Sequence, residues 1–286
     1  MKCVVDNGAL APFSKYNFKS NIFKNVYKDK FVYKCEKCGL RQADVSKVNE
    51  DALLRYYAYD YRNVAKIAVE LNEGSSPWYQ SRAKAIAELV PGMPQRVFEL
   101  GAGYGYNLKA IKARFPDAEF FTDELDETMR FGGVAQPGSL DDGPFDLIVL
   151  SHVLEHFTDP VSLLRSAGQA LTSGGVIIVE VPNDLEGIVP LNGPDEPHLT
   201  FMTEPTLRNL IQVAGLRIVE SFTAGPAVRR PSFGSKVRKA VGRLLAMTAA
   251  GRKLIVRRRT AYTTAANFSQ RNPDGVFLRA IITANK

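Results

Sequence analysis

A short apolar run followed by three alternate glycines constrains the fold of this chain more than any other feature. Residues 97–100 are apolar, β-branched or aromatic apart from one glutamate, and the run is too short for a helix, so we expect a strand. Gly101, Gly103 and Gly105 follow at once. Residues 107–115 then have apolar side chains at helical spacing. A glycine-rich turn between a strand and a helix lets a ligand approach main-chain amides, because no Cβ stands in the way. The segment therefore predicts a nucleotide-type binding turn.

The spacing of the glycines distinguishes between two kinds of cofactor. A dinucleotide-binding G-x-G-x-x-G turn would need glycine at position 106, where this chain has Tyr106. The spacing G-x-G-x-G, preceded by Glu99, instead resembles the first motif of the class I S-adenosylmethionine-dependent methyltransferases. The resemblance implies that Glu99 and the turn amides hold the methionine end of S-adenosylmethionine.

A second acidic position is implied by the same resemblance. It should end the second strand, about 20 residues further on, and hold the ribose hydroxyls. Residues 118–124 are a predicted short strand that ends in carboxylates; Glu124 aligns best with the ribose ligand, and Asp123 is the competing choice. The residues that the resemblance assigns to the cofactor are Glu99, Gly101, Ala102, Gly103, Tyr104, Gly105, Glu124, Ser151 and His152.

Further motifs follow in the order typical of this family. Residues 145–151 are continuously apolar, as in a buried parallel strand. The stretch from His152 to His156, followed by Asp159-Pro160, resembles the "LEH…DP" segment of the small-molecule branch. Additional helices are predicted over 161–171 and 206–214, and additional strands over 176–181, 216–222 and 275–283, with a break at 173–175. The resemblance implies an α/β fold, a Rossmann-like seven-stranded, mostly parallel sheet with helices on both faces.

We expect three parts in the chain. Residues 1–48 are predicted to form a small zinc-ribbon-like module, and residues 49–286 the methyltransferase domain. Within that domain, residues 49–88 look helical and carry tyrosines that either cover the cofactor or pack in the core. Residues 226–272 are predicted to be a basic helical insertion before the last strand.

The basic insertion dominates the charge of the chain. The formal net charge is +7, and eleven Lys or Arg but no Asp or Glu lie between positions 226 and 270. The remainder is therefore net negative, so we expect no nucleic-acid partner. An amphipathic cationic helix within 236–259 could contact a phosphorylated substrate, the surface of a membrane, or only solvent; of these we favour the substrate. The chain has neither an apolar run of about 18–20 residues nor a hydrophobic signal core, so we expect a cytoplasmic protein.

The three cysteines indicate a metal site rather than a disulfide framework. Cys35 and Cys38 form a C-x-x-C knuckle followed by glycine, and Cys3 is the remaining cysteine. The region resembles the N-terminal C-x-x-C…C-x-x-C zinc module of many sugar and glycan methyltransferases, but here Asp6 stands at the fourth position. Three thiolates and one carboxylate could hold a structural zinc ion, and a degenerate module without metal is the alternative.

The chain has only three histidines, and the motif order brings all of them to one edge of the sheet. His152 and His156 follow the fourth strand, and they would share a helical face if a helix had already begun there. His198 precedes the helix at 206–214. Because a hydroxyl acceptor must lose its proton, we expect His198 or His156 to act as general base. An alternative follows from a resemblance to small-RNA 3′-end methyltransferases, in which a similar set, here His152, Glu155, His156 and His198, binds a divalent metal ion.

The sequence thus predicts methyl transfer from S-adenosylmethionine to a small polar acceptor, a hydroxyl of a sugar, nucleotide-sugar or glycan. The glycan preference rests on the resemblance of the N-terminal module. A lipid-linked or membrane-associated acceptor is the second interpretation, because of the cationic helix. The third is a cofactor-binding protein without transfer activity. The oligomeric state and the acceptor atom, oxygen, nitrogen or carbon, stay open.

Overall fold

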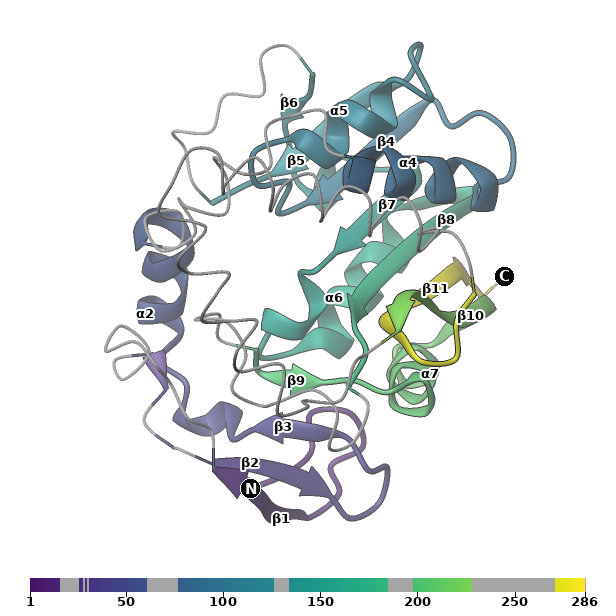
Figure 1. Ribbon diagram of the computed structural model, residues 1–286. Coiled ribbons are helices and arrows are strands. Elements are labelled where there is room, and N and C mark those ends of the chain that lie inside the picture. Colours follow the sequence, from purple (N-terminus) through teal and green to yellow (C-terminus); the bar gives the residue numbers. More distant parts are fainter. Residues whose placement is uncertain are drawn as a thin grey trace, which may run out of the picture.

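Two β-sheets organise the protein. The computed structural model describes residues 1–15, 26–27, 29, 31–60, 77–125, 134–184, 198–227 and 271–285. One sheet has seven strands in the order β10-β11-β8-β7-β4-β5-β6, and the other has four in the order β1-β2-β3-β9 (Figure 1). The large sheet carries the glycine turn, and the small one is built mainly by the N-terminal segment.

The large sheet is mostly parallel, as expected. Strands β6, β5, β4, β7 and β8 run parallel, and β11 is antiparallel to both of its neighbours, β8 and β10. The strands are β4 (Arg96–Leu100), β5 (Glu119–Asp123), β6 (Gln136–Pro137), β7 (Phe145–Ser151), β8 (Leu171–Pro182), β10 (Leu216–Ala227) and β11 (Gly275–Ala284). The carboxyl ends of β4, β5, β7 and β8 therefore meet at one edge, where open α/β sheets bind their ligands.

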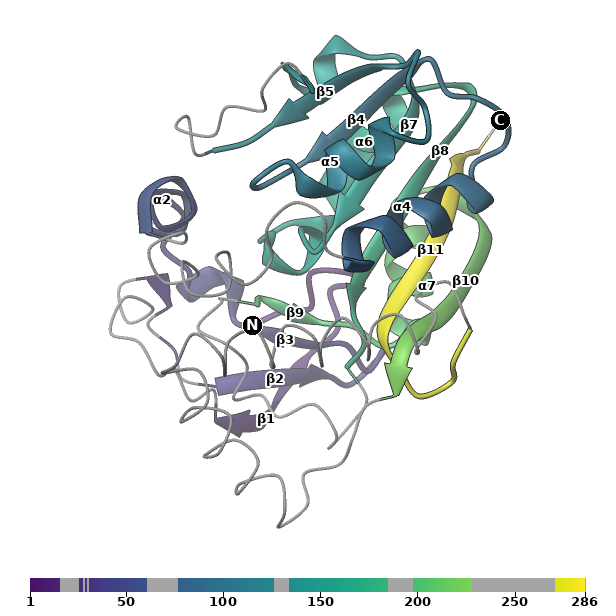
Figure 2. The ribbon, with the colours of Figure 1, turned by 45° about the horizontal axis from the view of Figure 1, so that its top comes forward.

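Helices cover both faces of this sheet. Helices α4 (Pro77–Leu89) and α5 (Tyr106–Lys112) lie on one face, and α6 (Pro160–Gln169) and α7 (Glu204–Val213) on the other (Figures 1 and 2). In the described parts of the chain, three short 3₁₀ turns connect elements: η1 (Val45–Lys47), η3 (Leu140–Asp142) and η4 (Leu154–His156). The three-layer arrangement is the one that the sequence predicts.

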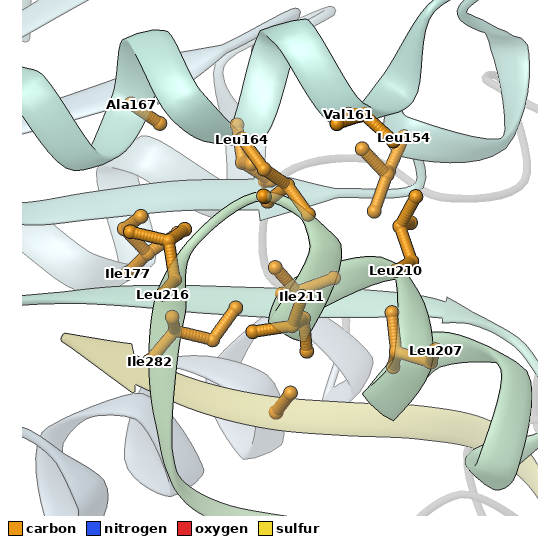
Figure 3. Packing of buried hydrophobic residues seen from close by; sticks show 14 of the residues in the cluster. Leu154, Val161, Leu164, Ala167, Ile177, Leu207, Leu210, Ile211, Leu216 and Ile282 are labelled. Atoms are coloured by element: carbon orange, nitrogen blue, oxygen red, sulfur yellow. The ribbon is translucent and has the colours of Figure 1, made fainter. Parts of the chain in front are cut away.

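The strand sequences explain the two covered faces. In β7, Leu147 and Val149 belong to the buried cluster under α4 and α5, whereas Ile148 and Leu150 belong to the cluster under α6 and α7. Alternate side chains of a strand point to opposite faces, so a strand covered on both sides must be apolar throughout. Figure 3 shows Leu164 of α6 and Ile211 of α7 within the second cluster.

The small sheet joins the N-terminal segment to a loop of the large domain. Its strands are β1 (Leu10–Lys15), β2 (Phe31–Cys35), β3 (Arg41–Ala43) and β9 (Thr200–Phe201). Strand β3 pairs with β9 in the register Arg41 to Phe201, and the amide of Ala43 donates to the carbonyl of Leu199 (2.8 Å). Residues 1–48 thus share a sheet with the loop that begins at His198.

The structure refines three local expectations. Residues 49–60 are helical as expected, as α2 (Glu50–Arg55) followed by a π-helical turn, η2 (Tyr56–Asp60). The glycine pair at 174–175 does not separate a helix from a strand, because α6 already ends at Gln169 and the pair lies within β8, where the pairing with β7 shifts register. His152 and His156 share no helical face, because His152 has φ of 56° and α6 begins only at Pro160, after the N-cap Asp159.

Two further expectations concern membrane-spanning helices and the basic insertion. Among the described residues, no helix is long and apolar enough to cross a membrane. The predicted basic helix within 236–259 lies outside the described residues, as does nearly all of the insertion at 226–272.

Candidate active site

The glycine turn lies at the carboxyl end of β4. Gly101, Gly103 and Gly105 all have positive φ, of 64°, 60° and 69°, which side chains with a Cβ rarely adopt. A Cβ on Gly101 would also meet Val153 at 3.0 Å. Gly105 is the N-cap of α5, so the turn ends at a helix N-terminus. The sequence folds this way because glycine adopts a left-handed conformation without steric cost, and this turn needs it three times within five residues.

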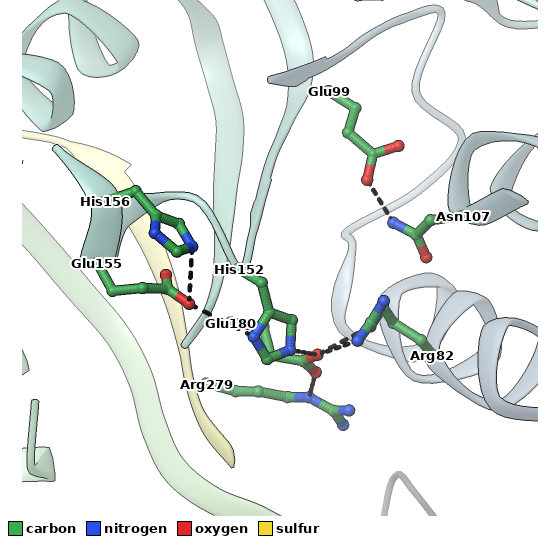
Figure 4. A network of polar contacts seen from close by, with 8 residues as sticks. All are labelled: Arg82, Glu99, Asn107, His152, Glu155, His156, Glu180 and Arg279. Carbon is green, nitrogen blue, oxygen red and sulfur yellow. Dashed lines mark hydrogen bonds and ion pairs between the residues drawn. The ribbon is translucent and has the colours of Figure 1, made fainter. Parts of the chain in front are cut away.

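Glu99 is buried beneath this turn. It is 2% exposed, and Asn107 of α5 donates to its Oε1 at 2.5 Å (Figure 4). Burial raises the pKa of Glu99 to about 7, although the Asn107 hydrogen bond acts in the opposite direction. Within the described chain, the Glu99 Oε2 and Asn107 Oδ1 atoms are buried acceptors without a hydrogen-bond donor. A cationic donor such as an ammonium group fits two such acceptors.

The second predicted acidic residue contacts the turn directly. Glu124 follows β5, and its Oε2 accepts a hydrogen bond from the amide of Gly103 at 2.7 Å. Asp123, the competing choice, accepts from the amide of Gly101 through its backbone carbonyl at 2.8 Å. Beside the turn, the ring of Tyr104 stacks on that of Tyr106 with centroids 5.8 Å apart, and Ala102 is buried. These predicted cofactor residues therefore gather at one place.

Ser151 ends β7, and His152 follows it directly, near the glycine turn. The hydroxyl oxygen of Ser151 is buried and, in the part of the chain that the structure describes, has no hydrogen-bond partner. His152 has left-handed backbone, and its side chain lies between two carboxylates, with Nδ1 3.5 Å from Glu155 and Nε2 3.2 Å from Glu180. Burial alone would lower the pKa of His152, but the two carboxylates raise it to about 9.

Glu180 is the centre of a buried ion cluster under this edge. Arg82 of α4 donates to its Oε1 from Nε (2.8 Å) and Nη2 (2.7 Å), and Nε of Arg279 in β11 donates to Oε2 at 2.6 Å (Figure 4). Burial acts to raise the pKa of Glu180, but the two guanidinium groups hold it well below its usual range. The cluster fixes α4, β8 and β11 relative to His152.

His156 and His198 lie side by side at the same edge. Their ring centroids are 4.9 Å apart, and Tyr57 of η2 reaches Nδ1 of His156 with its hydroxyl at 2.6 Å. Nε2 of His156 lies 3.8 Å from Oε1 of the buried Glu155. The amide of Leu199 donates to the carbonyl of Glu155 (2.8 Å), which ties the His198 loop to η4. His156 and His198 are therefore the two histidines that lie together as candidate catalytic residues, whereas His152 lies between Glu155 and Glu180.

The N-terminal cysteines form a separate cluster with Asp6. Sγ of Cys3 lies 3.7 Å from Sγ of Cys38, and Sγ of Cys35 lies 3.4 Å from Oδ1 of Asp6. One ligand atom from each of the four residues lies within 4.8 Å of the others. Three sulfur ligands and one carboxylate match the coordination number of a structural zinc site.

Several residues of this region carry no motif and were missed from the sequence. Glu180 and Arg279 are charged residues inside otherwise apolar strands, which is a signal of a buried ion pair, although not of the partner. Arg82 and Asn107 lie on helices where such residues are common. Tyr57 is one of the tyrosines expected to cover the cofactor or pack in the core, but its hydrogen bond to His156 was not expected. Only the folded chain brings them to the glycine turn and the histidines.

The comparisons with known proteins agree with this arrangement. A family model described as a methyltransferase domain matches residues 62–221, which is more than half of the chain. Trans-aconitate 2-methyltransferase of Methylobacterium nodulans is 30% identical over 115 residues, 36% of this chain and 45% of that protein. The chain thus matches less than half the length of this curated relative.

Solved structures show the same fold at low identity. The plantazolicin methyltransferase BpumL, in complex with SAH, is 15% identical with a TM-score of 0.51 over 82% of this chain and 94% of that chain. A complex between the Haloferax volcanii Trm112 methyltransferase activator and the putative methyltransferase matches at 16% identity and a TM-score of 0.51, covering 80% of this chain and 98% of that one. Together with the motifs and the glycine turn, the match to the family model shows that the chain belongs to the methyltransferase domain family, among the class I S-adenosylmethionine-dependent methyltransferases.

Proposed function

We propose that the protein transfers a methyl group from S-adenosylmethionine to a small polar acceptor, a hydroxyl of a sugar, nucleotide-sugar or glycan. One observation supports this most directly. The glycine turn with Glu99, and the His156–His198 pair, both follow strands whose carboxyl ends form one edge of the sheet. A cofactor and an acceptor bound there would lie next to each other, as an in-line displacement requires.

The cofactor would be held by the residues around the turn. Glu99 Oε2 and Asn107 Oδ1, two buried acceptors for which the described residues offer no donor, fit the ammonium group of the methionine part. Glu124 would exchange its hydrogen bond with Gly103 for the ribose hydroxyls. The remaining members of this proposed site are Gly101, Ala102, Tyr104, Gly105, Ser151 and His152. When bound, the sulfonium supplies an electrophilic methyl group.

The acceptor would lose its proton at the histidine pair, with His198 or His156 as general base. The same histidine would hold the acceptor oxygen toward the methyl group that the bound cofactor would supply, and would take up the proton that this oxygen loses. Tyr57, hydrogen-bonded to Nδ1 of His156, would orient that ring.

The preference for a glycan-type acceptor rests on the N-terminal segment. Its cysteine cluster resembles the module of sugar and glycan methyltransferases, and its strand β3 borders the His198 loop through β9. A phosphorylated acceptor would suit the basic insertion, which leads from β10 to β11. A lipid-linked acceptor would suit the same insertion, and is the alternative that the assay below separates.

The test combines binding and transfer. Calorimetry with S-adenosylmethionine should show one saturable site, weakened at least ten-fold in Glu99→Ala and unchanged in Glu119→Ala, whose side chain is mostly exposed on the same sheet. Transfer of a labelled methyl group is then measured on nucleotide-sugars, free glycans and lipid-linked sugars. Transfer to the lipid-linked set alone would favour the alternative acceptor. Binding without transfer to any of them would favour a cofactor-binding protein.

We also propose that Cys3, Asp6, Cys35 and Cys38 hold a structural zinc ion. The backbone amides of Val5 and Cys38 each approach a cysteine Sγ at 3.5 Å, as donors that stabilise thiolates. Purified protein should contain zinc close to one equivalent at this cluster, lost in Cys35→Ser and kept in Lys37→Ala within the same turn. Zinc below about a tenth of an equivalent in the unaltered protein would refute the site, since a structural site should be nearly full.

A further inference from the structure

The loop that carries His198 is fastened to the N-terminal segment. The next residue, Leu199, is 1% exposed, and its carbonyl accepts a hydrogen bond from the amide of Ala43 in β3 at 2.8 Å. The amide of Leu199 donates to the carbonyl of Glu155 in η4 at 2.8 Å. Directly afterwards, strand β9 pairs with β3 (Figures 1 and 2). The place of His198 is therefore set by β3 as well as by η4.

An ion pair between Arg41 and Asp184 extends this attachment to the large sheet. Arg41 lies on β3, and Asp184 lies two residues beyond the carboxyl end of β8. The two side chains are 3% and 4% exposed, and Nη2 of Arg41 also donates to the backbone carbonyl of Asp184 at 3.5 Å. The amide of Asp184 donates in turn to the carbonyl of Met202 at 2.7 Å. The pair thus joins β3, the end of β8 and the loop after His198.

The two charged residues hold adjacent positions of that loop. Arg41 is opposite Phe201 in the pairing of β3 with β9, and Asp184 is bonded to Met202, the next residue. Residues 199–202 therefore each contact β3 or Asp184 through the backbone. A loop bound at consecutive residues has a single position, because its buried backbone groups find their partners only there.

Stability alone does not account for this ion pair. Burying two charges costs solvation free energy that offsets much of their attraction, so apolar residues could fill the same space at no loss. A planar guanidinium, in contrast, binds a carboxylate in a defined direction. The guanidinium of Arg41 is also held over the ring of Phe13 in β1, 4.9 Å from its centroid. The pair therefore defines how β3 and the end of β8 are arranged around the loop.

This arrangement determines how the two candidate bases lie. The ring of His198 packs against that of His156, with centroids 4.9 Å apart, and against that of Phe201 at 6.3 Å. His156 is held independently, by η4 and by the hydroxyl of Tyr57. A shift of β9 would therefore move His198 relative to His156. A general base must lie within hydrogen-bond reach of its proton, and a misplacement of about 1 Å can reduce the rate roughly a hundred-fold.

We propose that Arg41 and Asp184 are positioning residues of the acceptor site, which set the place of His198 against His156 by fixing the loop at residues 198–202. Their effect on the reaction rests on the proposed methyl transfer, whereas their control of the position of His198 does not. The N-terminal segment is then a working part of the active site, because it supplies Arg41 and the strand to which the loop is paired.

The position of His198 is tested without any acceptor. The chain has only three histidines, so their ring signals can be followed one by one by nuclear magnetic resonance of the full chain labelled with ¹⁵N-histidine. In Arg41→Met the signals of His198 should shift or split, whereas those of His152, held by Glu180, should change far less. His198→Gln assigns the signals. Arg165→Met, which removes an exposed guanidinium on α6, is the control and should leave all three rings unchanged.

Transfer is measured on the same variants with the acceptor that the labelled-methyl assay identifies. Arg41→Met should lower the turnover number roughly ten- to a hundred-fold, with the affinity for S-adenosylmethionine within about two-fold. Arg41→Lys keeps the charge but not the planar fork, and should fall between Arg41→Met and the unaltered protein. Circular dichroism checks that each variant is folded. Should Arg41→Met not fold, the double variant Arg41→Met/Asp184→Leu decides, because it leaves no unpaired charge in the interior.

The outcomes separate this inference from the proposed function. Ring signals of His198 that stay unchanged in the folded variant overturn the positioning role, even where methyl transfer is observed. Shifted signals with an unchanged turnover number overturn it as well, because the reaction would then not depend on the place of His198. Shifted signals in a protein that methylates no acceptor uphold the control of the His198 loop and refute the proposed reaction.

Discussion

The hydroxyl of Tyr57 lies 2.6 Å from Nδ1 of His156, and this contact joins the N-terminal helical segment to the candidate active site. The two rings meet edge to face, with centroids 5.3 Å apart. Because Nδ1 is engaged in this way, Nε2 is the nitrogen that faces Glu155. The hydroxyl of Tyr57 therefore determines which ring nitrogen of His156, namely Nε2, is available to act as a base or as a ligand.

Tyr57→Phe should reduce the methyl-transfer turnover number roughly ten- to a hundred-fold, the range known for partners that orient metal-ligating histidines, because the ring of His156 loses the hydroxyl that orients it. Cofactor affinity should stay within two-fold, since Tyr57 contacts the acceptor side. Turnover and S-adenosylmethionine affinity are measured separately by transfer assay and calorimetry. Tyr59→Phe is the matched control, since Tyr59 is 72% exposed two residues away. Equal turnover in the two variants would show that the hydroxyl of Tyr57 does not act on His156.

Glu180→Gln should destabilise the fold strongly. The substitution leaves Arg82 and Arg279 buried at the end of the sheet without their shared carboxylate. Removing one partner of a buried ion cluster typically costs about 3–5 kcal/mol. Urea denaturation should therefore show a lower midpoint. Glu88→Gln is the control, because its pair with Lys84 is exposed and should contribute less than about 1 kcal/mol. A midpoint shift no larger than that of the control would contradict the structural role of the cluster.

The sequence predicts the glycine turn well because the signal is local. Three glycines, a preceding strand and a following helix lie within 20 residues, and their conformations follow from sterics. The ion cluster could not be predicted in the same way, because Arg82, Glu180 and Arg279 come from three distant elements. The apolar patterns of β8 and β11 mark Glu180 and Arg279 as buried charged residues, but they do not show that the two are partners. The left-handed backbone of His152 was not predicted, because a positive φ is uncommon for any residue other than glycine.

Glu99 should make cofactor binding depend on pH. Burial raises its pKa to about 7, so in the free protein the carboxyl becomes protonated as the pH falls below that value. The ammonium group of the cofactor requires the ionised form, and affinity should fall from pH 8 to pH 6, by up to about ten-fold per pH unit below 7. Calorimetry across this range tests the slope, and Glu99→Gln should bind weakly with little slope. An equal slope in that variant would assign the pH dependence to another group.

The same carboxyl affects stability in the opposite sense. The folded protein holds the proton of Glu99 up to about pH 7, whereas the unfolded chain loses it near the ordinary pKa of 4.5. The folded state binds more protons between these values, so the free energy of unfolding should decrease as the pH rises through this window. Denaturant unfolding of the cofactor-free protein should show a smaller decrease in Glu99→Gln than in the unaltered chain. A decrease of equal size in both would exclude Glu99 as its source.

Gly8→Ala should disturb the cysteine cluster without removing any of its ligands. A Cβ at this position would lie 2.7 Å from Sγ of Cys35 and 2.9 Å from Oδ1 of Asp6, closer than non-bonded atoms approach. Both neighbours belong to the proposed zinc site and cannot move independently of it. Overpacking of this kind typically costs about 1–3 kcal/mol. We therefore expect a reduced zinc content and a lower unfolding temperature, measured by metal analysis and thermal denaturation. Ala9→Ser, at the next and exposed position, is the control and should match the unaltered protein. Full zinc occupancy with a lowered unfolding temperature in Gly8→Ala would mean that the glycine serves packing alone, because the ion would then tolerate the displaced ligands.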